Sequence, residues 1–154
     1  MTEREPSVAE VMVKAVLAID LDTNVKECSK AMAKRGVSCS VITQANRAIG
    51  IVTERDLVSK VLADAFDPTK VYVRDIMSTP LITISPNSSL TDAAAQMAEY
   101  RVRRLVVVDQ KGSMVGIITA GDIARSLAEK HGYREATFNA LARYKEGTES
   151  GPYQ

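Results

Sequence analysis

The octet GIVTERDL at residues 50–57 returns as GIITAGDI at residues 116–123, and this pair decides the fold. Both octets read as a glycine, an apolar stretch, a threonine, two variable residues and an aspartate. Self-similarity at a fixed spacing is the signature of a repeat architecture. The sequence therefore predicts two copies of one structural unit.

The similarity extends well beyond the two octets. VAEVM at residues 8–12 aligns with VRDIM at residues 73–77, a shift of 73 − 8 = 65 positions. The second copy gains one residue near position 109, so that Gly50 aligns with Gly116 at a shift of 66. Two units of roughly 60 residues are longer than common solenoid repeats. They predict a closed pair rather than an open array.

Each unit is predicted to run β-α-β-β-α. First strands are expected at 16–19 and 81–84, and hairpin turns at 44–47 and 109–112. Helical spacing gives each unit two apolar helix faces. In the first copy these are Val25, Cys28 and Met32, then Leu57, Val58, Val61 and Leu62; in the second they are Leu90, Ala93, Ala94 and Met97, then Ile123, Ala124, Leu127 and Ala128. In the second strand of the first copy, Val37, Cys39 and Val41 alternate with polar residues.

A three-stranded sheet cannot cover both of its faces alone, so the two copies are expected to pack together. The predicted fold class is mixed α/β (α+β), with two β-α-β-β-α repeats, at 7–65 and 72–130, forming a pseudo-twofold pair. Residues 131–154 are predicted to form a C-terminal helix and a flexible tail. That helix would either pack on its own module or serve as a dimer arm or a contact for a partner.

The composition places the chain among globular proteins. Twenty basic and nineteen acidic residues give a net charge of +1, which argues against a protein that coats nucleic acid or a membrane. The sequence has no apolar run long enough to span a bilayer and no signal peptide at its start. We therefore expect a cytoplasmic protein.

The sequence also argues against an enzyme. His131 is the single histidine, and it lies after the last repeat helix. The chain contains none of the nucleophile, zinc or phosphate-loop motifs that mark common active sites. No catalytic residues and no metal ligands are predicted.

The Thr-x-x-Asp element of each octet has two compatible interpretations. A threonine followed three residues later by an acid is a helix-start signal, and for a single motif this capping interpretation is favoured. The same helix start presents unpaired N–H groups and a positive dipole, which attract phosphate. An aspartate accepts hydrogen bonds through two oxygens, which suits the paired hydroxyls of a ribose.

These residues resemble a tandem pair of CBS domains (a Bateman module), named after cystathionine β-synthase. The segments that carry the resemblance are VRDIMSTPLITISPNSSLTDAAAQM and RVRRLVVVDQKGSMVGIITAGDI, with weaker first-copy partners VAEVMVKAVLAIDLDTNVKECSKAM and RGVSCSVITQANRAIGIVTERDL. Together they cover about residues 7–130. The resemblance implies two clefts between the sheets, which bind adenosine derivatives such as AMP, ADP, ATP or, in some members, S-adenosylmethionine or a dinucleotide.

The resemblance also assigns roles to particular positions. The aspartate of each octet would hold the ribose hydroxyls, the threonine would lie near ribose or phosphate, and the residue before the aspartate would contact phosphate. Backbone of the first strand would contact adenine, and basic residues entering the middle strand would reach phosphate. The candidate ligand-binding residues are Ala18, Thr53, Arg55, Asp56, Thr83, Arg101, Arg103, Arg104, Thr119 and Asp122.

The two copies differ at the entry to the middle strand. The second copy carries three arginines there, and the first copy has Gly36, Ser38 and Cys39 instead. Arginine forks match phosphate geometry well, although a solvated strand end is the alternative interpretation. The difference predicts unequal occupancy of the two clefts.

The sequence therefore predicts a non-catalytic regulatory protein that senses adenine nucleotides, forms a homodimer and acts on an unidentified protein target. No cofactor is expected beyond the nucleotide itself. One alternative ligand is S-adenosylmethionine or another adenosyl compound, which needs no phosphate contacts. Two further alternatives are a nucleic-acid-binding regulator that uses the same arginines and a structural dimer with vestigial sites.

Overall fold

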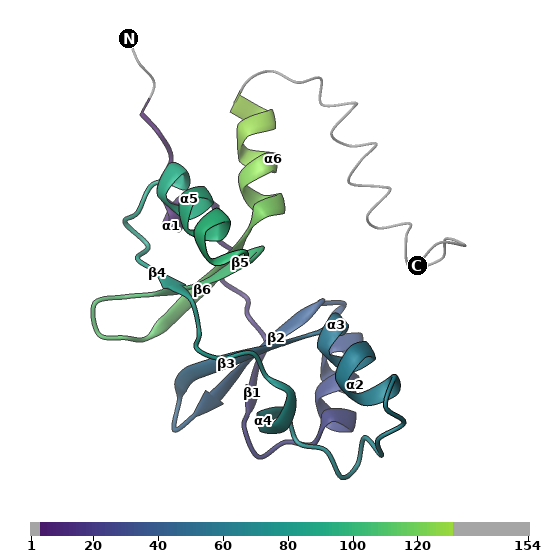
Figure 1. Ribbon diagram of the computed structural model, residues 1–154. Helices are drawn as coiled ribbons and strands as arrows, with labels where there is room; N and C mark the ends of the chain where they lie inside the picture. Colours follow the sequence, from purple (N-terminus) through teal and green to yellow (C-terminus); the bar gives the residue numbers. More distant parts are fainter. Residues whose placement is uncertain (1–3, 131–154) are drawn as a thin grey trace.

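The computed structural model describes residues 4–130, which form two three-stranded sheets with helices packed against them (Figure 1). The first half contains α1 (Val8–Val11), β1 (Ala18–Asp20), α2 (Val25–Arg35), β2 (Cys39–Gln44), β3 (Arg47–Thr53), α3 (Glu54–Leu57) and the π-helix η1 (Val58–Leu62). The second half contains α4 (Val73–Ile76), β4 (Thr83–Ile84), α5 (Leu90–Tyr100), β5 (Arg104–Val108), β6 (Met114–Thr119) and α6 (Ala120–Lys130). The predicted α+β class and repeat order are confirmed.

Both sheets have the same topology. β1 pairs parallel with β2 and β2 pairs antiparallel with β3, while β4, β5 and β6 repeat this arrangement. The hairpin between β2 and β3 turns at Ala45 and Asn46, both with positive φ, which is the geometry of a tight two-residue hairpin. The first strands begin later than predicted, at Ala18 and Thr83.

The short helices α1 and α4 are exchanged between the repeats, as Figure 1 shows. Val8 of α1 is fully buried in the core of the second repeat, whereas Val73 of α4 is fully buried in the core of the first. The segment that follows α1 also belongs to the other repeat in space, because Val13 pairs with Ile117 of β6. Each repeat therefore completes its core with a helix from the other.

The glycine of each octet makes this exchange possible. A Cβ at Gly50 would lie 2.8 Å from Met77 Sδ, and a Cβ at Gly116 would lie 2.7 Å from Met12 Sδ. Both distances are shorter than a side chain tolerates, so the exchanged segment can pass over the strand only where a side chain is lacking. The octet glycine is thus explained by packing.

The two sheets pack face to face through a small apolar cluster that includes Val41, Val106 and Ile117. This packing corrects the predicted alternation of β2, because Ser40, Val41 and Ile42 are all buried. Val41 faces the other sheet, and Ile42 faces the helices of its own repeat. A strand covered on both sides has no exposed face over these residues.

The predicted apolar faces of the closing helices are only partly confirmed. Val61 and Ile123 are buried, but Val58 is 56% exposed, Leu62 is 69% exposed and Leu127 is 46% exposed. Ala124 of α6 is exposed as well, and so is Ala94 on α5. These helices lie against one side of a small sheet, so a single row of each helix is covered and the rest of the apolar residues face outward.

Two expectations lie outside the described residues, namely the C-terminal helix of 131–154 and the position of His131. Among residues 4–130, no helical segment combines the length and the apolar character that a membrane crossing requires.

Candidate functional site

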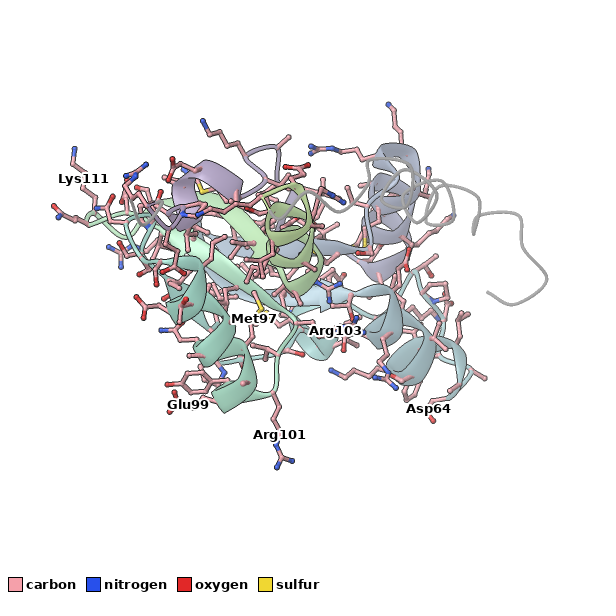
Figure 2. All side chains as sticks on the ribbon, turned by 90° about the horizontal axis from the view of Figure 1, so that it is seen from above. Asp64, Met97, Glu99, Arg101, Arg103 and Lys111 are labelled. Atoms are coloured by element: carbon pink, nitrogen blue, oxygen red, sulfur yellow. The ribbon has the colours of Figure 1, made fainter. Side chains whose placement is uncertain are left out.

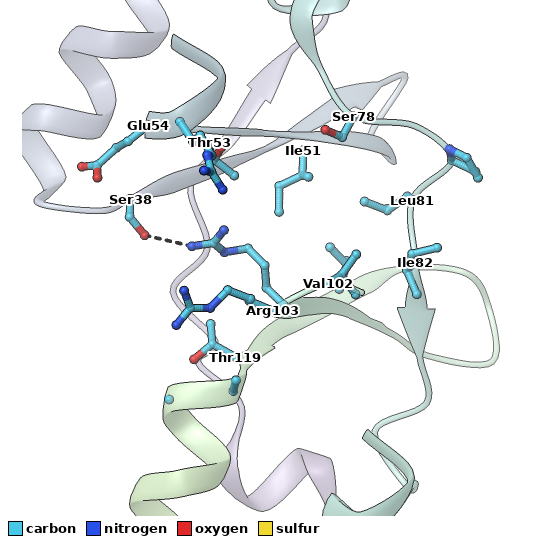
Figure 3. A pocket seen from close by; sticks show the side chains of 16 residues that line it. Ser38, Ile51, Thr53, Glu54, Ser78, Leu81, Ile82, Val102, Arg103 and Thr119 are labelled. Carbon is cyan, nitrogen blue, oxygen red and sulfur yellow. Dashed lines mark hydrogen bonds between the residues drawn. The ribbon is translucent and has the colours of Figure 1, made fainter. Parts of the chain in front are cut away.

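A cleft of about 610 Å³ opens between the two repeats (Figure 3). Part of the lining is formed by residues 53–55, where β3 passes into α3, and another part by residues 80–82, which precede β4. Residues 102–104 at the entry to β5 and 119–121 at the start of α6 complete the cleft. Because both repeats contribute walls, the cleft exists only in the packed pair.

Two helices begin at the cleft. Thr53 and Thr119 are the last residues of β3 and β6, and α3 and α6 start directly after them. The first N–H groups of a helix have no partner within the helix, and the helix dipole is positive at this end. Here the N–H groups of Glu54 and Ala120 already donate to the carbonyls of Ser38 and Arg103, and those of Asp56 and Asp122 donate to the threonine hydroxyls, so each helix start offers an anion mainly its dipole.

Arg103 and Arg104 lie in the cleft together with Arg55. Arg104 Nη2 donates a hydrogen bond to Ser38 Oγ across the repeats, at 3.4 Å (dashed line in Figure 3). Arg104 Nε is buried, and it has no hydrogen-bond partner among the residues that the structure describes. An unpaired buried donor is costly, so an acceptor that entered the cleft would gain a hydrogen bond at this nitrogen.

Two opposite charges, those of Arg104 and Glu54, act on the Cys39 thiol. Burial raises the pKa of the Cys39 thiol, whereas the nearby Arg104 guanidinium lowers it and the Glu54 carboxylate raises it. Glu54 also lines the cleft, on the wall opposite Arg103 and Thr119 (Figure 3). The cleft is therefore positive on balance, with three arginines and one carboxylate among its lining residues.

Arg101 is separated from the other two arginines. It ends α5 in a left-handed conformation with φ of 54°, where the first repeat has Gly36. Its side chain is exposed and projects away from the protein in Figure 2. The structure therefore brings Arg103 and Arg104 into the cleft and leaves Arg101 in solvent.

Asp56 is almost fully occupied by contacts within the protein. Its Oδ2 accepts hydrogen bonds from the Thr53 backbone N–H at 2.9 Å and from the Thr53 hydroxyl at 3.1 Å. Its Oδ1 is 3.0 Å from Lys60 Nζ, which also donates to the Ile76 carbonyl at 2.8 Å. The aspartate thus forms the capping box that the sequence suggested, with a lysine added.

Asp122 forms the same capping box, with fewer hydrogen bonds to its carboxylate among residues 4–130. Its Oδ2 accepts from the Thr119 N–H at 2.9 Å, and its own N–H donates to the Thr119 hydroxyl at 3.1 Å. Its Oδ1 is 3.7 Å from Arg125 Nη1, which is an ion pair beyond hydrogen-bonding distance. Asp122 also borders a second cavity of about 360 Å³, together with Val11 and Ser126.

Besides Arg101, four candidates are not among the residues that line the cleft, namely Ala18, Asp56, Thr83 and Asp122. Ala18 and Thr83 are exposed, and the cleft is lined instead by Leu81 and Ile82, just before Thr83. Sequence reasoning missed these two apolar residues and Ser38. An apolar residue before a strand gives no signal of its own, because the core and a cleft wall use the same residue types. Within residues 4–130, no group of histidine, cysteine, aspartate and glutamate side chains is placed to hold a metal ion.

Known proteins with similar sequences and structures share this arrangement of two repeats. The CBS domain family matches the chain twice, over residues 8–63 and 73–129. An uncharacterized protein from Methanopyrus kandleri is 36% identical over 121 residues, which cover 78% of this chain and 62% of that protein. The chain thus spans less than two thirds of that relative.

Two solved structures resemble the whole pair. The CBS domain pair of protein MJ0100, in complex with 5′-methylthioadenosine and S-adenosyl-L-methionine, has a TM-score of 0.74 at 25% identity, covering 82% of this chain and 99% of that chain. A hexameric CBS-CP12 protein from bloom-forming cyanobacteria has a TM-score of 0.74 at 26% identity, covering 97% of this chain and 88% of that chain.

Proposed function

The chain belongs to the CBS-domain family, and we propose from this premise that it is a non-catalytic regulatory module that binds an adenine nucleotide. The ligand would be AMP, ADP or ATP, held in the cleft between the repeats. The observation that supports a phosphate-bearing ligand is Arg104, whose buried Nε lacks a partner inside a cleft that also contains Arg55 and Arg103.

The cleft offers a suitable surface for each part of such a ligand. Leu81, Ile82 and Val102 form an apolar region that can hold a flat base. The arginines and the two helix starts lie at the other end, where they would neutralise phosphate. The volume also falls in the range of small-molecule sites, about 300 to 1,000 Å³.

The test is a calorimetric titration of the chain with AMP, ADP and ATP, repeated with Arg104→Gln. The variant keeps a polar side chain of similar length but loses the charge and the fork. Hydrogen bonds to charged groups contribute about 1.5 to 3 kcal/mol, so nucleotide affinity should fall by about 10- to 100-fold. Arg47→Gln is the matched control, because Arg47 is exposed at the far end of β3 and should leave affinity unchanged.

S-adenosylmethionine is the second candidate ligand, and the bound state of the MJ0100 pair supports it. This ligand carries no phosphate, so its affinity should not depend on Arg104. Binding of S-adenosylmethionine that survives Arg104→Gln, with no binding of nucleotides, would contradict our first choice and favour the second. Titration of nucleic acid, with and without added salt, checks the remaining alternative.

We also propose that two copies of the chain associate as a homodimer and act on a protein target in the cytoplasm. The closing helix of the first repeat and the turn after it present Val58, Leu62 and Phe66, which are 56%, 69% and 55% exposed. Val58 and Leu62 lie at the two ends of the π-helix η1, and Phe66 follows the turn after it. Large apolar side chains exposed together are a frequent mark of an interaction surface.

A further inference from the structure

We propose that two copies of the chain associate head to tail, so that helix α2 of each copy lies against helix α5 of the other. This inference rests on the proposed homodimer and gives that homodimer an orientation. It follows from a difference in charge between two helices that hold equivalent places in the two repeats.

The outer side of α2 is basic. Lys26, Lys30 and Lys34 follow one another at intervals of four residues, which places them on one side of the helix, and all three are exposed. Arg35 adds a fourth cation at the end of the helix. Glu27, which pairs with Lys30 at 3.9 Å, is the one acidic residue of α2, so the helix has a net charge of 4 − 1 = +3.

The corresponding side of α5 is acidic. At the repeat shift of 65 residues, the positions of the three lysines are held by Thr91, Ala95 and Glu99. The charged residues of α5 are Asp92 and Glu99, so its net charge is −2. Both are exposed, and seven residues apart they share one side of the helix. Figure 2 shows Glu99 on the side of α5 that faces away from the sheets.

These charges favour one orientation of the pair. In a head-to-tail dimer each basic α2 meets an acidic α5, and the twofold axis makes this contact twice. A head-to-head dimer would place α2 against α2 and α5 against α5, and both contacts would be repulsive. The spacings also agree, because Lys26 to Lys34 spans about 12 Å along a helix and Asp92 to Glu99 about 10 Å.

The affinity itself must come from apolar contact, because exposed ion pairs contribute little each. α2 and η1 cover the same face of the first sheet, since Val25 and Val61 belong to one core cluster. The exposed Val58 and Leu62 of η1 therefore lie on the same side of the repeat as the lysines. Tyr100, which is 51% exposed, offers an apolar surface at the end of α5. The charges then select the orientation in which these surfaces meet.

The experiment reverses the charge of each helix in a separate variant. Lys30→Glu with Lys34→Glu changes α2 from +3 to −1, and Ala95→Lys with Glu99→Lys changes α5 from −2 to +1. In either variant, a head-to-tail dimer would bring like charges together. The dimer dissociation constant measured by sedimentation velocity at low salt should therefore rise about tenfold, and less at high salt.

The control changes the same number of charges away from both helices. Arg47→Glu with Lys111→Glu reverses two exposed cations at the β2–β3 and β5–β6 hairpins, so the net charge changes as much as in the α2 variant. The dissociation constant of this control should stay near that of the wild type. Thermal melting verifies that every variant is folded.

A mixture of the α2 variant and the α5 variant tests the orientation directly. In a head-to-tail dimer of the two, the reversed α2 meets the reversed α5, and the unchanged α5 meets the unchanged α2. Both contacts are then attractive. The mixture should associate about as tightly as the wild type, although neither variant does so alone.

The outcomes separate this inference from the proposed homodimer. If the wild type dimerises and the α2 variant self-associates as tightly or more tightly, the head-to-tail orientation is wrong and the homodimer stands, because only a head-to-head pair loses repulsion at α2 in that variant. A mixture that associates no better than its components would also overturn the orientation. A wild type that stays monomeric at every concentration contradicts both the homodimer and its orientation.

Discussion

The first and second octets share one backbone arrangement but differ in the side chains around it. Both present a threonine cap and a buried aspartate at the start of a helix. Around the first aspartate stands Lys60, and around the second stands Ser126. At the entry to the middle strand, Ser38 and Cys39 correspond to Arg103 and Arg104. The difference teaches that the repeat preserves a backbone frame and varies the side chains beside the aspartates and at the entry to the middle strand.

The largest expected effect concerns the octet glycines. The nearest atom to an added Cβ is a methionine Sδ at both glycines, but the nearest backbone atom is the Val13 carbonyl at 2.9 Å for Gly116 and the Ser78 carbonyl at 3.1 Å for Gly50. Gly116→Ala should therefore lower the free energy of unfolding by about 3 kcal/mol and Gly50→Ala by somewhat less. Urea unfolding of both variants measures this, and equal losses would show that the two exchanged segments are equally adaptable.

The next effect concerns the exposed apolar residues of the first repeat, Val58, Leu62 and Phe66. On the corresponding helix of the second repeat, between residues 120 and 130, Leu127 is the one large apolar residue that is exposed. Leu62→Glu should raise the dimer dissociation constant by about thirtyfold, which corresponds to about 2 kcal/mol. Sedimentation velocity over a concentration series measures this constant. Leu127→Glu serves as the matched change on the second repeat, and a larger effect there would move the interface to α6.

The smallest effect concerns the two caps. The Thr53 hydroxyl accepts from the Asp56 N–H and donates to the Asp56 carboxylate, whereas the Thr119 hydroxyl accepts from the Asp122 N–H. Thr53→Ala should cost about 1 kcal/mol of stability and Thr119→Ala somewhat less, in line with other cap residues. Thermal melting resolves the difference, and a greater loss for Thr119→Ala would contradict this account of the hydrogen bonds.

The repeat itself could be predicted from the sequence because its strongest markers each have a local physical cause. Gly50 and Gly116 allow close packing, and Thr53 and Asp56 cap a helix, so these residues recur in register. The exchange of α1 and α4 could not be predicted. An apolar residue such as Val8 fits either core, and only the packing of the whole chain decides which core receives it.

The site could be predicted in part for the same reason. Arg103 and Arg104 were expected near the cleft and lie there, but nothing in the spacing showed that Arg101 would end a helix and point outward. Lys60 carried no signal in the sequence, since its partner Ile76 is a backbone carbonyl in the other repeat. Contacts between distant backbone and side chains are properties of the fold and not of a local pattern.

The exchange of α1 and α4 also bears on how such a chain could arise by gene duplication. A single ancestral copy would have had no second repeat to receive its first helix, and its own core would have lacked the residues corresponding to Val8 or Val73. Two such copies could complete each other only by swapping helices as separate molecules, in an association that depends on concentration. Fusion into one chain replaces that encounter with an intramolecular one at a high effective concentration. In a fused chain the two halves are free to differ, since neither half has to recognise an identical partner.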